Sequence, residues 1–301
     1  MAIHFAYTQK IMPYKSLKSK LVLFLKGLAM GGMDIIPGVS GGTMALILGI
    51  YPDLVLSLHN VKPMALVHLA RGQWQLAKQE LSAINLHFLL PLGAALLLAP
   101  FLMAHLIFHV LDTYPGYLYG FFFGLIVGSA LLIFKKLPRH TLGSVCCMLV
   151  GALITYVITG FTGNIQLPHS FPYIFLCGMI SINAMILPGI SGAFFSYIMG
   201  QYSYMIEATR TLNLLVLGSF ALGASIGLMT FSRLASYMLK HHELHMLSFL
   251  IGLMLGSLRL PLIHIYVNDL VWWHSVGAGL LALGLIASIE YIRKRADAAI
   301  T

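Results

Sequence analysis

The sequence predicts an all-α polytopic membrane protein built from two inverted repeats, each a re-entrant helical hairpin followed by three transmembrane helices. Three observations lead to this prediction. Of the 301 residues, 59% are hydrophobic and only 9% are charged, a composition far from that of a soluble globular protein. Long runs of the chain carry no charge, and one short motif from the first half returns in the second half.

The candidate membrane spans are long apolar runs. A bilayer core about 30 Å thick is crossed by roughly 20 apolar helical residues, so most of these runs are long enough to span the membrane. We expect three spans in each half of the chain. The runs are residues 88–111, 117–134, 142–158, 212–229, 246–258 and 271–289.

An internal repeat divides the chain into residues 1–165 and 166–301, which together form a single integral membrane domain. The stretch from Pro37 to Gly41, PGVSG, returns as PGISG from Pro188 to Gly192. The same offset relates other glycines and the tyrosines downstream of both motifs. Because so many matches in one order are difficult to obtain by chance, we interpret the halves as homologous.

Each half opens with two short apolar helices on either side of its Pro-Gly pair. We expect helices at residues 21–35 and 43–57 in the first half, and at 173–187 and 191–207 in the second. About 15 residues at ~1.5 Å each reach roughly 22 Å, which is less than the hydrocarbon thickness. The segments 21–58 and 173–207 are therefore predicted to be re-entrant hairpins.

Three spans and a returning hairpin make an odd number of crossings, so the second half must be inserted upside down. This topology places most basic residues in loops on one side, as the positive-inside rule requires, with both termini cytoplasmic. The net charge of +9 then needs no nucleic-acid partner. Inverted repeats with broken helices are typical of secondary transporters, and we expect the hairpin tips to meet at a cavity near the midplane.

The breaks have the chemistry of an anion site. Ser40 and Thr43 in the first half, and Ser191 in the second, are placed to cap the helix that follows each Pro-Gly pair. Free N–H groups and the dipole at such a helix start attract negative charge, and glycines let an anion approach the backbone. The alternative is that the Pro-Gly pairs only turn the chain.

Charged residues near the hairpins form a second group of candidates. Asp34 is the only acidic residue deep in the first hairpin, and an ionisable group at membrane depth is a functional hypothesis. It could carry a coupling proton or sodium ion, pair with Lys26, or act as a structural cap. The candidate cations for an anionic headgroup are Lys26, Arg210, Arg233 and Arg259, of which Arg233 could instead reach the interface. Arg210 could instead reach the interface or be neutralised by Glu207.

The residues of the first break resemble a known family. The chain reads Gly27-Leu-Ala-Met-Gly-Gly-Met-Asp34 and continues from Pro37 to Tyr51, and the second half reads ILPGISGAFF from Ile186 and MGQY from Met199. These segments are similar to the polyprenyl-phosphate transporter family, formerly a domain of unknown function. Through the repeat, the resemblance extends over essentially the whole chain.

The resemblance implies transport of undecaprenyl phosphate, returned from the outer to the inner leaflet of the bacterial cytoplasmic membrane for reuse. It gives a polyprenyl phosphate lipid as partner, with no cofactor. By motif position, the headgroup site is framed by Asp34, Pro37, Gly38, Ser40, Gly41, Gly42, Pro188, Gly189, Ser191 and Gly192.

Two other functions stay open. One is an ion-coupled secondary transporter of a small organic anion, and the other is a polyprenyl-(pyro)phosphate phosphatase. Undecaprenyl-pyrophosphate phosphatases have a similar loop, but Gly41 and Gly192 stand where that loop has its arginine. We therefore predict no catalytic residues, and the histidines lack the partners of a metal site.

Overall fold

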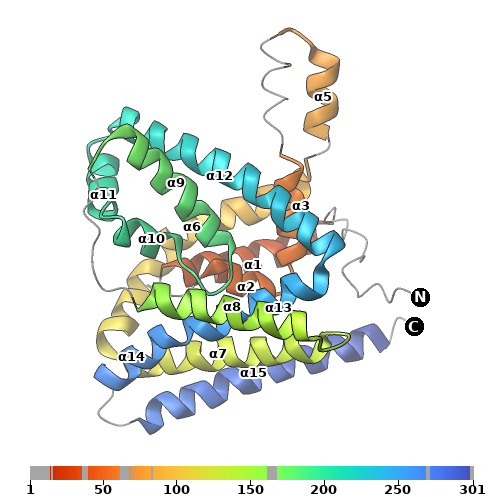
Figure 1. The fold of residues 1–301 in the computed structure, drawn as a ribbon, viewed down its shortest axis with the longest axis vertical. Coiled ribbons are helices and arrows are strands. Elements are labelled where there is room, and N and C mark those ends of the chain that lie inside the picture. The colour runs from red at the N-terminus through yellow and green to blue at the C-terminus, as the bar shows by residue number, and fades with distance from the viewer. Residues whose placement is uncertain are drawn as a thin grey trace.

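The computed structural model describes residues 14, 16–35, 40–61, 68, 71–82, 84–160, 168–268 and 272–298. Within these ranges the regular elements are helices, and none is a strand (Figure 1). The predicted all-α class is therefore confirmed.

Among the described residues, 6 helical segments are long and apolar enough to cross a membrane. The predicted apolar runs match the first three segments to within two residues at both ends, whereas each of the last three segments continues well beyond the end of its run. The chain is a multi-pass membrane protein. The segments are α6 (Leu86–Thr113), α7 (Pro115–Lys136), α8 (Leu142–Thr159), α12 (Leu214–His241), α13 (Glu243–Ser257) continued by α14 (Arg259–Asn268), and α15 (Trp273–Ala298).

Shorter helices precede the long ones in each half, and one expectation about them is wrong. We expected a single helix after each break, at 43–57 and at 191–207, but each of these helices is interrupted. Gly49 and Gly200 have φ of 69° and 67°, a left-handed conformation that glycine adopts readily and that ends a helix. The short helices are α1 (Leu17–Asp34), α2 (Gly41–Ile47) and α3 (Tyr51–His59), then α9 (Phe171–Ile186), α10 (Gly192–Ile198) and α11 (Tyr202–Arg210).

The helices from the first break to the first long span have the same lengths in the two halves. Helices α2 and α10 each have 7 residues, and α3 and α11 each have 9. Helices α6 and α12 each have 28 residues. Helices α2 and α3 meet at a bend of 118°. An additional helix, α5 (Trp74–Ser82), lies between α3 and α6 and stands away from the bundle in Figure 1.

Eight of the described helices pack as four parallel pairs through small residues. In the pair α1–α6, Gly27 lies against Ala95 and Gly31 against Ala99, so the two helices run in the same direction. Small residues let helix backbones approach closely inside a membrane. The same ascending order joins α9 to α12 (Phe175 with Gly223, Met179 with Gly227), α7 to α15 (Gly120 with Ser275, Gly124 with Gly279) and α8 to α13 (Met148 with Gly252, Ala152 with Gly256).

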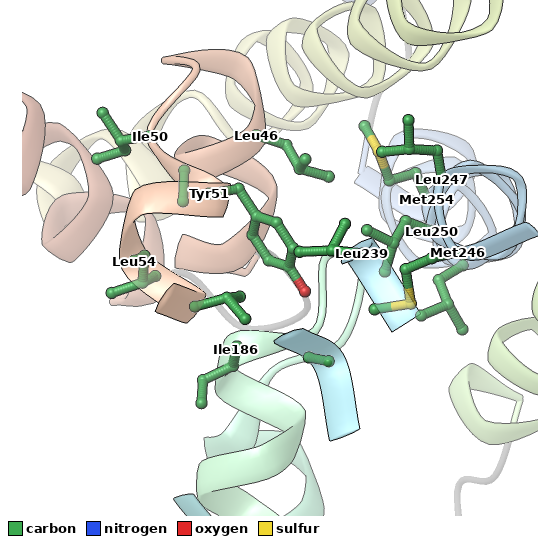
Figure 2. Packing of buried hydrophobic residues seen from close by; sticks show 14 of the residues in the cluster. Leu46, Ile50, Tyr51, Leu54, Ile186, Leu239, Met246, Leu247, Leu250 and Met254 are labelled. Carbon is green, nitrogen blue, oxygen red and sulfur yellow. The ribbon is translucent and has the colours of Figure 1, made fainter. Parts of the chain in front are cut away.

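The buried core lies where the two groups of short helices meet the long ones. Tyr51, the first residue of α3, is fully buried. Figure 2 shows its ring among Leu46 of α2, Ile186 of α9, Leu239 of α12 and Leu250 of α13. The ends of α2 and α9 are thus held in one apolar cluster.

Candidate functional site: the junction of the two breaks

The two breaks contact each other directly. The Ser40 hydroxyl donates a hydrogen bond of 2.9 Å to the Leu187 carbonyl, and the Gly189 N–H donates one of 2.8 Å to Thr43 Oγ1. We call the residues 40–43 and 185–189 the junction. The prediction that the breaks meet is confirmed, whereas the cavity between them stays a prediction. Pro37 and Gly38 lie outside the described residues.

The N–H groups at the start of α2 already have partners. The Gly41 N–H donates to Asp34 Oδ1 at 2.6 Å, and the Gly42 N–H donates to Ser40 Oγ at 3.1 Å. The Thr43 N–H donates to the Ser40 carbonyl at 3.0 Å. The predicted cap at Ser40 is confirmed. The predicted cap at Thr43 is wrong, because Thr43 lies inside α2 and its hydroxyl oxygen accepts from the Gly189 N–H. Our expectation of free donors was also wrong for this helix. The Asp34 carboxylate is itself the negative charge at the positive end of α2.

Glycines at the first break make room for these contacts. A side chain at Gly41 would meet Asp34 Oδ2, and one at Gly42 would meet the Ile186 carbonyl oxygen. In this conformation the glycines therefore bring α2 close to the carboxylate and to the end of α9. The approach of an anion is not what requires them here.

The second break uses its residues differently. Pro188 is buried. Gly189 has φ +85°, and a Cβ added at this residue would lie only 2.6 Å from the Leu253 carbonyl oxygen. Gly192 packs against the Ser181 carbonyl. Ser191 occupies the N-cap position of α10, but its side chain makes no capping hydrogen bond. The predicted cap at Ser191 was wrong, since the local symmetry does not extend to the hydroxyl.

Two polar atoms at the breaks are buried without a partner among the described residues. They are Asp34 Oδ2 and Asn183 Oδ1. The position equivalent to Asp34 in the second half is Met185, so a carboxylate is present at one break only. An unsatisfied buried acceptor is costly and is expected to have a functional or structural reason.

Lys26 does not pair with Asp34. Its ammonium donates to the Leu48 carbonyl at 2.9 Å, at the C-terminal end of α2, where a positive charge is stabilising. Asp34 bonds to Gly41 instead. Lys26 and Asp34 are separated by two turns of α1, about 12 Å along its axis, which explains why the predicted alternative of an ion pair is wrong.

Arg210 and Arg259 lie away from the junction. Arg210 is exposed in the last turn of α11. Glu207 is also described, and it forms no ion pair with Arg210. Arg259 begins α14 and reaches the end of α8, where its Nη1 donates to the Tyr156 carbonyl at 2.8 Å. Its guanidinium carbon lies 4.4 Å from the centre of the Tyr156 ring. Their role in binding a headgroup stays a prediction.

Comparison with known proteins identifies the family. The model of the undecaprenyl phosphate translocase-like family (VCA0040-like) matches residues 30–274, a range that includes both breaks. The chain belongs to this family. A protein named polyprenyl-phosphate transporter from Vibrio cholerae is 37% identical over 253 residues, which cover 84% of this chain and 80% of that protein. One of the same name from Staphylococcus aureus is 29% identical over 296 residues, covering 92% and 98%. No solved structure gives a significant match.

Some junction groups of this family member are not visible as motifs. The Leu187 carbonyl and the Gly189 N–H are backbone groups, so no side-chain pattern marks them as partners of Ser40 and Thr43. The only sequence signal for Tyr51 is the repeat, because Tyr51 follows Gly49 as Tyr202 follows Gly200. Within the described residues, no group of three or more His, Cys, Asp and Glu side chains is placed to hold a metal ion.

Proposed function

We propose that this chain is a transporter that returns undecaprenyl phosphate, or a closely related polyprenyl phosphate, from the outer to the inner leaflet of the bacterial cytoplasmic membrane. The observation that carries the proposal is the hydrogen-bonded junction of two broken helices in a multi-pass membrane protein. The family and the relatives named for translocation and transport of such lipids support the choice of substrate.

The direction of the helices supports two inverted, re-entrant hairpins. Helix α1 runs parallel to α6 and therefore starts at the same end, and α9 likewise starts with α12. If α6, α7 and α8 each cross the membrane, α6 and α12 begin on opposite sides. The hairpins then enter from opposite faces and meet at the junction, as in secondary transporters with inverted repeats.

Charge supports the orientation of the bundle. The end where α6 and α1 begin and where α7 and α15 finish is rich in basic residues, whereas the opposite end has Arg210 and Arg259 among its described residues. Cytoplasmic loops carry the excess of Lys and Arg, so we assign the basic end to the cytoplasm, with both chain termini on that side. The described basic residues at this end include Lys18, Lys20, Arg71, Lys78, Lys135, Lys136, Arg139, Lys240 and Arg295.

In the proposed mechanism the junction opens and closes during alternating access. Opening breaks the bonds from Ser40 to Leu187 and from Gly189 to Thr43, and it exposes polar backbone groups to the headgroup. Asp34 and a phosphate are both anions, so they compete for the Gly41 N–H. Protonation of Asp34, or its binding of a sodium ion, would remove the negative charge that competes with the phosphate and weaken the hydrogen bond from that N–H, which makes Asp34 the candidate for ion coupling. The lipid is moved without a chemical step.

The test is a leaflet-selective assay of undecaprenyl phosphate in proteoliposomes, with proton and sodium gradients imposed separately. We expect the lipid to move across the bilayer and to remain phosphorylated. Transport of a small organic anion without lipid movement would favour that alternative function. Release of inorganic phosphate by the purified protein would instead indicate a phosphatase.

Asp34→Asn tests the coupling. The amide keeps an acceptor for the Gly41 N–H but cannot ionise, so we expect transport to lose its response to the coupling gradient while the protein stays folded. Asp112→Asn, at an exposed position near the end of α6, is the matched control and should behave as the wild type. An unchanged rate and gradient response in Asp34→Asn would remove Asp34 from the mechanism.

A further inference from the structure

Helix α5 has large apolar side chains that are exposed in the part of the chain that the structure describes. The Trp74 side chain is 70% exposed and Leu76 is 45% exposed. The helix stands apart from the bundle (Figure 1), and of its described side chains only Glu80 is partly buried. A tryptophan this exposed, in a protein that lies within a bilayer, needs an explanation from its surroundings.

The residue order of α5 makes it amphipathic. At 3.6 residues per turn, positions 74, 76, 77 and 81 fall on one half of the helix, and these are Trp, Leu, Ala and Leu. The other half has Gln75, Lys78, Gln79 and Ser82, all exposed. Glu80 is the one acidic residue of the helix, and it lies within the apolar half.

The position of α5 along the chain places it at the basic end of the bundle. It lies between α3 and α6, close before the start of α6 at Leu86. Because α6 and α1 are parallel, this is also the end at which Lys18 and Lys20 lie. We call residues 71–82, which contain α5, the arm. The arm adds exposed Arg71 and Lys78 to that end.

We infer that α5 lies in the headgroup layer of the inner leaflet, with Trp74 at the interface and with Arg71 and Lys78 against the phosphates of anionic phospholipids. Tryptophan is enriched at the boundary of hydrocarbon and water. Amphipathic helices with basic residues on the polar face lie in the plane of the interface, and basic side chains are attracted to anionic lipid. The arm is joined at both ends to helices that are themselves in the membrane, so the bilayer is within its reach. This inference does not depend on which substrate is transported.

The fluorescence of Trp74 tests the inference. The sequence has three tryptophans, so the variant Trp272→Phe/Trp273→Phe leaves Trp74 as the only one in the full chain. We would reconstitute it in nanodiscs of phosphatidylcholine and phosphatidylglycerol, with bromine placed on the lipid chains either near the headgroups or near the chain ends. The matched control is Trp74→Phe, which retains the exposed pair at the start of α15. A Tyr pair at 272 and 273 replaces the Phe pair if that variant does not fold.

We expect Trp74 to emit at a shorter wavelength than a tryptophan in water and to be quenched more strongly by shallow than by deep bromines. Emission at the wavelength of a water-exposed tryptophan, with quenching by iodide and none by brominated lipid, would overturn the inference and leave the arm free for a soluble partner. Arg71→Gln/Lys78→Gln should reduce the quenching in anionic bilayers. Unchanged quenching in that variant would overturn the assigned contact with lipid phosphate.

Discussion

Thr43→Val should loosen the junction by a calculable amount. Valine has nearly the shape of threonine but no oxygen, so the variant removes the acceptor of the 2.8 Å hydrogen bond from the Gly189 N–H. Thr43 and Gly189 are both buried, and the amide would lose this partner at a site with little access to water. A buried donor without a partner costs about 1–3 kcal/mol. Opening of the junction should therefore become roughly 5- to 150-fold more favourable.

Amide hydrogen exchange on the protein in nanodiscs measures this opening. Peptides that contain Gly189 should exchange faster in Thr43→Val by a factor within that range, while the long helices keep their protection. Thr155→Val is the matched control, because Thr155 is equally buried and its hydroxyl donates to the Gly151 carbonyl of its own helix. That variant should leave exchange at Gly189 unaltered. Equal exchange around Gly189 in the wild type and in Thr43→Val would refute the reasoning.

Two further predictions concern packing and the end of α8. Gly42→Ala should reduce thermal stability and slow transport, because the added methyl group meets the backbone of Ile186 and overpacking costs about 1–3 kcal/mol. The control is Gly93→Ala, which has open space around it and should be neutral or stabilising. Equal melting temperatures of the two variants would contradict this prediction. Arg259→Ala should lower the melting temperature because its bond to the Tyr156 carbonyl and its contact with that ring are lost. Among the described residues Nη1 makes the only hydrogen bond of the guanidinium, so its other N–H groups are available to a lipid phosphate. Arg259→Ala should therefore also weaken the binding of undecaprenyl phosphate. Unchanged lipid affinity would show that Arg259 only supports α8.

The spans were predictable because a single physical requirement dominates them. Crossing hydrocarbon needs a long apolar helix, so run length alone located both ends of α6, α7 and α8 closely, and it located the starts of the later spans better than their ends. The breaks were predictable for a similar reason, since a Pro-Gly pair inside an apolar run readily interrupts a helix. The interruption at Gly49 and Gly200 was missed although both residues belong to the repeat. A glycine does not by itself reveal whether it is there for a left-handed φ or for close packing.

The partners of charged and polar groups depended on tertiary structure. The proximity of Asp34 to the Gly41 N–H follows from the turn between α1 and α2, which the sequence pattern does not describe. Lys26 was correctly placed near the first hairpin, but its partner is a carbonyl at the far end of α2. Ser191 shows the limit of reasoning from a repeat, because the backbone position is repeated without the hydrogen bond.

The pairing of helices between the two halves has a consequence for the order in which the protein is made. Helix α7 packs along α15, and α8 packs along α13, so two of the four parallel helix pairs join a segment made early to one made late. Until α15 leaves the ribosome, Gly120 and Gly124 of α7 lack the helix against which they pack. Neither half can therefore complete its packing alone, and a chain truncated before α15 would present these glycines to lipid or to the quality-control machinery of the membrane.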